Sequence, residues 1–328
     1  MSSTLNSIGL AAREPAILGT TEDNCLDYWK EVVYGPLEDF LNRKGKRIRA
    51  ELIEISFQLG GGQGRPPSQI IDFVELLHAG SLIIDDIQDN SRNRRQKEAL
   101  HLTYGIPVAI NTGNWLYFAA LEFLTDLELP SADLMQITKK VLKVIKDCHE
   151  GQAIDLMATF DKVPASHMVS TVQQISHLKT GGLTGLAAWL GGVVASADEE
   201  TCNRLALLGQ DLGVGLQMQN DFVELQRAAV SRCSSDDLRN RRCTWPWAWL
   251  ANSQSSDVLQ SIAKFACDEM PNCQSTASRM LEKIEIIAVN QINQKLMHAL
   301  NAIEKFEAEQ SIKNRLNQIV TNLELHYV

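Results

Sequence analysis

The sequence predicts an all-α protein, and three observations support this prediction. Apolar residues recur every three to four positions through most of the 328 residues, which is the period of an amphipathic helix. No convincing run of alternating apolar and polar residues indicates a β-strand. Glycine and proline fall between the periodic stretches rather than inside them. These patterns favour a fold built from packed helices.

The breaks between periodic stretches set the expected helix ends. Pro130, Pro164 and Pro271 lie at such breaks, where a residue without a backbone N–H is tolerated. The polar stretches 91–99 and 229–241 are expected to be loops. The expected helices cover residues 24–42, 46–60, 67–90, 107–127, 131–161, 165–178, 181–195, 198–228, 244–251, 255–268, 274–290 and 292–325.

We expect a single helical domain over residues 24–328, because no linker-like stretch and no change of composition divides the chain. Residues 1–23 are expected to form a flexible lead-in. They lack the basic start and apolar core of a secretory signal. No apolar run reaches the roughly 18 residues needed to span a bilayer, so no integral membrane segment is expected.

The composition of the chain excludes some classes of protein. The net charge of −9 argues against a nucleic-acid partner, which would require a basic surface. The 45% hydrophobic content is too high for a disordered chain. The seven cysteines are odd in number and form no CxxC pair, which favours free thiols and a cytoplasmic location.

The strongest functional signal lies in residues 74–90. His78, Ser81, Asp85 and Asp89 are spaced three or four apart, so they share one helix face. Two carboxylates four residues apart repel each other unless a cation lies between them. Mg²⁺ prefers oxygen ligands and commonly keeps water and substrate phosphates. The helix end therefore predicts a magnesium site, with a solvated surface as the alternative.

A second oxygen-rich patch closes the apolar stretch 212–225. Gln217, Asn220 and Glu224 fall on one helix face, and Asp221 lies beside it. Two such helices facing each other across a bundle would form a multi-metal site for a diphosphate. This second patch strengthens the interpretation of the first.

Basic residues complete the set. Lys46 and Arg49 lie three apart at a predicted helix start, a position that favours an anion. Two arginines directly follow the first acidic cluster, and Lys179-Thr180 precede a pair of glycines at another helix junction. Each basic pair alone would be read as exposed surface charge. Together, the acidic and basic sets are what two diphosphates and bridging Mg²⁺ require.

These residues resemble a known family. The sequences GKRIR (45–49), DDIQD (85–89), KTGGL (179–183), QMQNDF (217–222) and RRCTW (241–245) resemble, in this order, motifs of the trans-prenyl diphosphate synthases. The likeness is greatest to geranylgeranyl diphosphate synthases. It implies an isoprenoid-synthase-type helical bundle around a central active-site cavity, and a homodimer.

The resemblance also implies roles for individual residues. Asp85 and Asp89 would bind two Mg²⁺ ions with support from Asp86, and the second motif would bind a third. The departing diphosphate would be stabilised chiefly by the first-motif aspartates with Arg94 and Lys179. Isopentenyl diphosphate would be held by Lys46, Arg49, His78 and Arg95. The allylic diphosphate would be held by Arg94, Lys179, Thr180, Gln217 and Arg242. The third ion would be held by Asn220, Asp221 and Glu224.

The implied reaction begins with ionisation of an allylic diphosphate in a dry apolar cavity. The double bond of isopentenyl diphosphate then attacks the allylic cation. The small residues Gly80 and Ser81 lie one turn before Asp85, where an aromatic side chain would block the growing tail. Their small size favours a twenty-carbon product, geranylgeranyl diphosphate, and leaves longer products open, because other helices also line the path of the tail.

The sequence departs from the family pattern at three places. The second motif, normally DDxxD, begins with Asn220 and ends with Glu224, which removes one negative charge. Arg242 replaces a lysine, and Gln96 replaces a glycine after the paired arginines. These changes leave two alternatives open: a terpene synthase that ionises an allylic diphosphate, and a non-catalytic regulatory subunit. The retained basic residues and the intact first motif favour the synthase.

Overall fold

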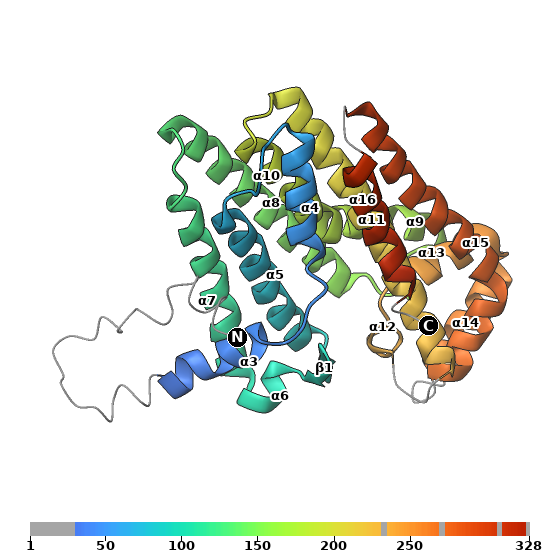
Figure 1. Cartoon of the computed structure of the whole chain (residues 1–328). Coiled ribbons are helices and arrows are strands. Elements are labelled where there is room, and N and C mark those ends of the chain that lie inside the picture. The colour runs from blue at the N-terminus through green and yellow to red at the C-terminus, as the bar shows by residue number, and fades with distance from the viewer. Residues whose placement is uncertain (1–29, 231–234, 269–272, 307–309, 326–328) are drawn as a thin grey trace. The chain divides into compact units, whose positions relative to one another are not determined.

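The computed structural model describes residues 30–230, 235–268, 273–306 and 310–325. Within these residues the regular secondary structure is helical, apart from one short hairpin and one isolated bridge, which confirms the predicted all-α class (Figure 1). The predicted lead-in over 1–23 lies outside the described residues. In the described ranges no helix combines the length and the apolar character needed to cross a membrane.

Contacts divide the chain into two compact units, which are described separately below. Unit 1 contains residues 1–47 and 67–134, and unit 2 contains residues 48–66 and 135–328. The expectation of a single domain stays a prediction.

Unit 1 is built on a pair of long helices, α5 (Ser68–Gln88) and α7 (Ile106–Thr125). They pack closely because glycines meet at their crossing: a Cβ atom at Gly80 would lie 2.8 Å from the carbonyl oxygen of Gly113. The shorter elements are a π turn (Lys30–Tyr34), α3 (Gly35–Leu41), the antiparallel strands β1 (Asn93–Arg94) and β2 (Lys97–Glu98), α6 (Leu100–Tyr104) and the beginning of α8 (Ser131–Met157).

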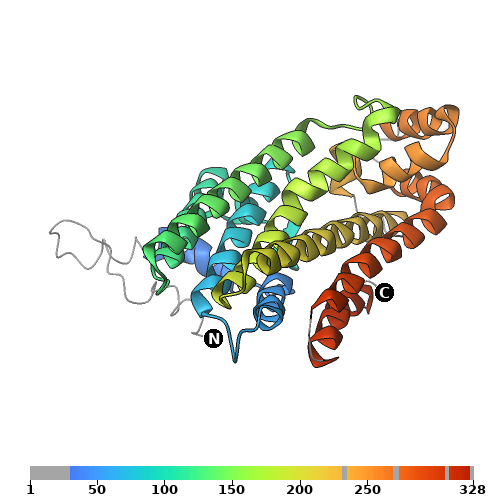
Figure 2. The same ribbon diagram turned by 90° about the horizontal axis from the view of Figure 1, so that it is seen from above.

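Unit 2 is centred on α11 (Glu199–Val230), which packs against α10 (Gly182–Val194) and α15 (Cys273–Ala302). Figure 2 shows α11 and α15 running side by side. The remaining elements are α4 (Ile48–Leu59), most of α8, α9 (Ala165–Ser176), a π turn η2 (His177–Gly181), α12 (Asp236–Arg239), α13 (Trp245–Ser253), α14 (Ser256–Asp268), a 3-10 turn η3 (Ile303–Lys305) and α16 (Gln310–Leu325).

The short helix α13 anchors the core of unit 2 through tryptophans. Trp247 and Trp249 are fully buried, and the ring of Trp247 stacks on Phe160 with centroids 4.0 Å apart. The indole N–H of Trp245 donates to Ser176 Oγ at 2.9 Å, so its polar atom is satisfied inside the core. Burial of such large rings fixes the position of the chain that leads into α13.

The structure corrects several expected boundaries. The expected helix 24–42 is helical over its described part up to Leu41, but it begins there with a π turn that leads directly into α3. The break expected near residue 291 does not occur, because the buried stripe Ile284, Ala288, Ile292 and Leu296 continues the helical period. The expected loops at 91–99 and 229–241 contain the β-hairpin and α12, respectively.

Candidate active site

The first acidic cluster lies at the C-terminal end of α5. Asp89 is the C-cap residue, and its N–H donates to the carbonyl oxygen of Asp85 at 2.8 Å. Asp85 and Asp89 are half-buried, whereas Asp86 is 1% exposed. A helix C-terminus carries partial negative charge, so three carboxylates are electrostatically unfavourable there without a cation. The donor set therefore fits a hard cation that also binds substrate oxygens.

One of these carboxylates already has a cationic partner. The Nε of Arg94 donates to Asp86 Oδ1 at 2.8 Å, and Asp86 Oδ2 is buried without a hydrogen bond. Burial raises the pKa of Asp86, and the neighbouring Arg94 opposes that shift. Asp86 thus orients Arg94, whereas its supporting role toward Mg²⁺ stays a prediction.

The hairpin β1–β2 presents the paired arginines. Arg94 pairs with Lys97, and the two residues between them, Arg95 and Gln96, have φ values of 53° and 64°. Two successive residues with positive φ are characteristic of a type I′ hairpin turn, where glycine is the residue without strain. The glycine that the family usually carries at position 96 is consistent with this backbone.

Sequence reasoning missed the residue that holds this hairpin. Arg43 has a 1% exposed side chain just after α3, and its Nη1 donates to the carbonyl oxygen of Glu98 at 2.9 Å and to that of Arg94 at 3.3 Å. Its Nη2 donates to Asp39 at 2.8 Å, and Asp39 also accepts from Lys97 at 2.8 Å. In the run NRKGKR, Arg43 gives no sequence signal that separates it from surface charge.

The other predicted residues of unit 1 lie on α5 and in the chain just before α4. His78 is half-buried on α5, two turns before Asp85, and its carbonyl oxygen accepts from Ser81 Oγ at 2.8 Å. Lys46 is exposed and precedes α4, so it does not share a helix with Arg49, which belongs to unit 2. Gly80 faces α7, so its missing side chain serves helix packing.

In unit 2, the π turn η2 places Lys179 and Thr180 between α9 and α10. π turns within helices occur frequently at functional sites. Lys179 Nζ lies 2.5 Å from Asp155 Oδ2, and Thr180 Oγ1 donates to Gln217 Oε1 at 2.6 Å. Gln217 Nε2 in turn donates to Asp221 Oδ1 at 2.7 Å. Thr180 and Gln217, both predicted to hold a diphosphate, are therefore brought together.

Asp155 is a second residue that sequence reasoning missed. Its carbonyl oxygen accepts from Nη1 of the buried Arg242 at 3.0 Å, while its carboxylate pairs with Lys179. Asp155 on α8 thus contacts both Lys179 and Arg242, two basic residues that were predicted from separate motifs. A lone carboxylate in the stretch GQAID gave no pattern that would have identified it.

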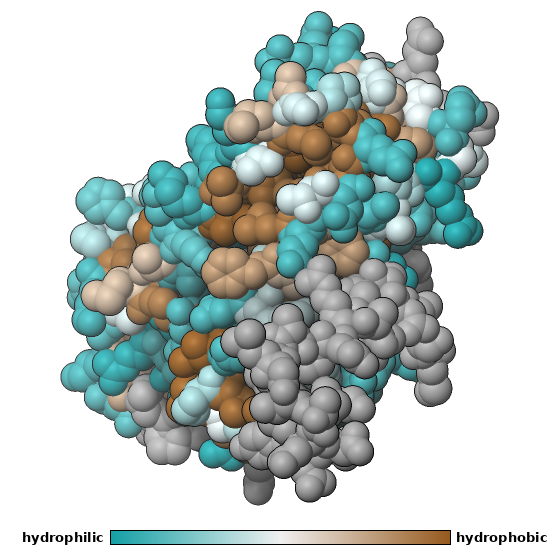
Figure 3. Space-filling view, turned by 90° about the vertical axis from the view of Figure 1, so that its left-hand side faces the viewer, coloured by the Kyte–Doolittle hydropathy of each residue, from teal (hydrophilic) through white to brown (hydrophobic). Residues whose placement is uncertain are grey.

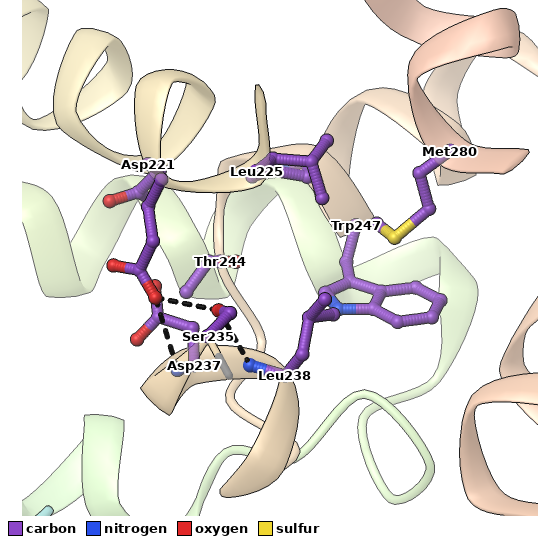
Figure 4. Close-up of a pocket in the computed structure, with 10 residues that line it drawn as sticks. Asp221, Leu225, Ser235, Asp237, Leu238, Thr244, Trp247 and Met280 are labelled. Atoms are coloured by element: carbon purple, nitrogen blue, oxygen red, sulfur yellow. Dashed lines mark hydrogen bonds between the residues drawn. The ribbon is translucent and has the colours of Figure 1, made fainter. Parts of the chain in front are cut away.

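The second acidic patch does not form the predicted ligand set. Asn220 is exposed, whereas Asp221 is 6% exposed and accepts from the backbone N–H of Trp245 at 3.1 Å. Glu224 accepts from Ser235 Oγ at 2.6 Å (Figure 4). Burial raises the pKa of Asp221 to about 7. The buried carboxylate therefore has both oxygens bound by protein donors, and the arrangement does not fit a third ion.

No group of three or more His, Cys, Asp or Glu side chains in the described ranges is arranged to hold a metal ion by itself. The pair Asp85 and Asp89 fits Mg²⁺ only if water and substrate phosphates supply the remaining ligands, as this ion commonly requires. The predicted residues thus form two clusters, one within each unit.

The fold defines the class of the protein. It matches the geranylgeranyl pyrophosphate synthetase from Pyrococcus horikoshii with a TM-score of 0.76 and 21% identity, over 98% of this chain and 94% of that one. It also matches a decaprenyl diphosphate synthase from Rhodobacter capsulatus with a TM-score of 0.80 and 18% identity, over 99% and 95% of the two chains. The architecture is thus that of the helical prenyl diphosphate synthases, as predicted.

Sequence comparison gives the family. Residues 30–284 match the polyprenyl synthetase family, and the chain belongs to this family of trans-prenyltransferases. It is 30% identical to a geranylgeranyl pyrophosphate synthase of Eremothecium gossypii, over 66% of this chain and 68% of the relative. It is 32% identical to the geranylgeranyl pyrophosphate synthase dpmaD of Metarhizium anisopliae, over 73% and 70% of the two chains.

Proposed function

We propose that this chain condenses an allylic diphosphate with isopentenyl diphosphate to form geranylgeranyl diphosphate. The observation that carries the proposal is the C-terminal end of α5, where Asp85 and Asp89 lie beside the Asp86–Arg94 ion pair. Carboxylates and an oriented guanidinium in one place suit a metal-bound diphosphate. Family membership supports the reaction class, and the names of the relatives support the product.

The two diphosphates require separate anion sites. Lys46, Arg49, His78 and Arg95 would bind isopentenyl diphosphate. Arg94, Lys179, Thr180, Gln217 and Arg242 would bind the allylic diphosphate, and Asp85 and Asp89 would bind Mg²⁺. The bound ion would neutralise charge on the leaving diphosphate. The basic side chains orient the two substrates, and buried apolar walls would exclude water from the allylic cation.

The number of ions is part of the proposal. The sequence predicts three, but the contacts of Asp221 and Glu224 with protein donors support only the sites at Asp85 and Asp89. We therefore assign the first motif to Mg²⁺ and leave the second out of the metal set.

A product assay tests the function. Purified protein with Mg²⁺ receives farnesyl diphosphate, with and without isopentenyl diphosphate, and both prenyl diphosphates and volatile hydrocarbons are analysed. We expect geranylgeranyl diphosphate only when both substrates are present. The absence of any product from farnesyl or geranylgeranyl diphosphate would contradict the proposal and favour a regulatory subunit.

The altered second motif favours one alternative. A terpene synthase would ionise the allylic substrate without isopentenyl diphosphate. This function would account for the asparagine at position 220, where the family usually has an aspartate. A hydrocarbon or terpene alcohol formed from the allylic diphosphate alone would establish this alternative. The retained Lys46, Arg49, His78 and Arg95 favour the synthase, because a terpene synthase has no use for a second diphosphate site.

The assembly that we propose is a homodimer formed through α7. Figure 3 views the side on which Figure 1 draws α7, and it shows apolar residues exposed there. Ile106, Ile110 and Phe118 are 52%, 41% and 71% exposed and lie at helical spacing. An exposed apolar stripe on one helix is typical of a protein interface. We also propose a cytoplasmic location, which the unpaired cysteine count supports.

A further inference from the structure

The segment Ser235–Trp245 of unit 2 is fastened to α11 at both of its ends. Glu224 binds the beginning of the segment, and Asp221, one turn earlier on α11, binds its last residue. These two residues are the acidic members of the altered second motif. The segment between the two contacts carries Arg242.

Glu224 holds the first end through two donors. Its Oε1 accepts from Ser235 Oγ at 2.6 Å and from the N–H of Asp237 at 3.3 Å. Ser235 is 6% exposed and is the N-cap of α12, where its Oγ also accepts from the N–H of Leu238 at 3.2 Å. Figure 4 shows these contacts beside Trp247 and Met280. The carboxylate therefore fixes the start of α12, near the positive end of its dipole.

Asp221 holds the second end. Its Oδ2 accepts from the backbone N–H of Trp245 at 3.1 Å, and its Oδ1 accepts from Gln217 at 2.7 Å. Trp245 is the first residue of α13, so the buried carboxylate satisfies a backbone donor at the N-terminus of that helix. A buried carboxylate with two such donors is costly to redirect, because its partners would lose their hydrogen bonds.

Between the two ends the segment is paired with the chain after α8. The N–H of Phe160 donates to the carbonyl oxygen of Arg241 at 3.0 Å, and that of Cys243 donates to Ala158 at 2.9 Å. The N–H of Arg242 donates to Asp237 at 2.8 Å. Arg242 is thereby held at 7% exposure, with its guanidinium on the carbonyl oxygen of Asp155.

We propose that Asp221 and Glu224 are positioning residues, which fasten the segment Ser235–Trp245 and so fix Arg242, instead of binding a metal ion. This inference rests on the proposed function in one respect: Arg242 is taken to bind the allylic diphosphate. It also accounts for the glutamate at position 224. Aspartate, the usual residue of the motif, is one methylene shorter and does not reach Ser235 from the same backbone.

The test measures amide hydrogen exchange of the segment Ser235–Trp245 in full-length protein with EDTA and no substrate. The variants are Glu224→Ala, Glu224→Asp and Ser235→Ala. The control is Glu200→Ala, because Glu200 lies exposed on the same helix and pairs with Arg204, away from the segment. We expect each of the three variants to exchange roughly tenfold faster over this segment, as the loss of a charged hydrogen bond predicts. The control should leave exchange unchanged.

Two further results separate positioning from metal binding. The double variant Glu224→Ala, Ser235→Ala should exchange more slowly than the product of the two single effects predicts, because both substitutions remove the shared Glu224–Ser235 contact. Glu224→Asp should raise the KM for the allylic diphosphate and leave the Mg²⁺ concentration for half-maximal activity unchanged. Unchanged exchange in metal-free Glu224→Ala, or a Glu224→Asp protein that needs less Mg²⁺, would overturn the proposal. The exchange results stand even if the proposed product does not form.

Discussion

Asp85 lies at the negative end of a helix dipole and one turn from a second carboxylate, Asp89. A carboxylate in such a position is unfavourable unless a cation lies beside it, so we assign its charge to the proposed metal site. We expect Asp85→Ala to lower kcat by at least about a thousandfold, because a group that stabilises charge in the transition state is lost. Circular dichroism should show an unchanged fold. Full activity in this variant would contradict the two-carboxylate metal site.

Arg43 holds the backbone of the hairpin β1–β2, which carries the residues that we propose to bind the diphosphates. Arg43→Met removes the donors to Arg94 and Glu98 while keeping the volume of the side chain. We expect the KM for isopentenyl diphosphate to rise about tenfold to a hundredfold with little change in kcat, because Arg95 loses its support. Arg43→Lys should restore part of the affinity. Equal effects on both substrates would show a general loss of folding instead.

At the scale of single residues, sequence reasoning found those whose spacing repeats. Asp85, Asp89 and Lys179 stand out by helical period or motif. Arg43 and Asp155 do not, because their roles depend on contacts with residues 55 and 24 positions away along the chain. Likewise, the spacing of Asp221 and Glu224 suggested metal ligands, whereas Ser235 and Trp245, which donate hydrogen bonds to them, lie 11 and 24 positions further along the chain.

The packing of α5 against α7 requires glycine at position 80 more strictly than at position 113. At Gly80 a Cβ atom would lie 2.8 Å from a backbone oxygen, while at Gly113 it would meet the end of the Ile84 side chain at 2.8 Å. A side-chain end can move and a backbone cannot. We expect Gly80→Ala to lower the free energy of unfolding by about 1–3 kcal/mol. Gly113→Ala should be nearly neutral, since alanine also favours the helix by about 1 kcal/mol. Urea denaturation of both variants checks this difference.

Ser81 remains the position from which product length can be tested on α5. It is half-buried and adjacent to the packed Gly80, so a substitution there does not press on the Gly113 backbone. We expect Ser81→Phe to shorten the product to fifteen carbons, measured by chromatography of the dephosphorylated alcohols. An unchanged chain length would show that the tail does not pass Ser81.

At the scale of elements, the sequence predicted most of the long helices, apart from the ends of α15 and α16, and it predicted the short elements poorly. Long apolar stripes determine helices such as α11, because many buried residues share one period. A two-residue strand or a four-residue helix has no period. The hairpin β1–β2 and α12 depend instead on contacts from Arg43 and Glu224, which no local pattern reveals.

The whole molecule exposes more apolar surface on α7 than a solvated helix requires. Phe118→Glu places a charge in the middle of the proposed dimer interface. We expect this variant to elute as a monomer near 36.5 kDa in light scattering, against a dimer for the parent chain. Asn114→Ala, on the same face, should leave the dimer intact. A parent protein that is itself monomeric would contradict the proposal.

For the whole chain, the family and the fold class follow from five short motifs in the right order. Recognising the order of the motifs requires no knowledge of long-range contacts, so the sequence alone supports both the family and the fold class. The division of the contacts into two units could not be predicted, because unit 2 combines residues 48–66 with a stretch that begins 69 positions after they end, at 135.

The positions of Lys179 and Thr180 depend on how many residues the π turn His177–Gly181 contains, and not only on which residues they are. A π turn holds one more residue than the α-helical turn that it replaces. Deleting one residue within it would leave an α-helical turn between α9 and α10, and residues that remain in the turn would shift around the helix axis by up to about 100°. Lys179 and Thr180 would then lose Asp155 and Gln217 together. A change that leaves the helix continuous would thus disrupt the part of unit 2 that we propose to hold the allylic diphosphate.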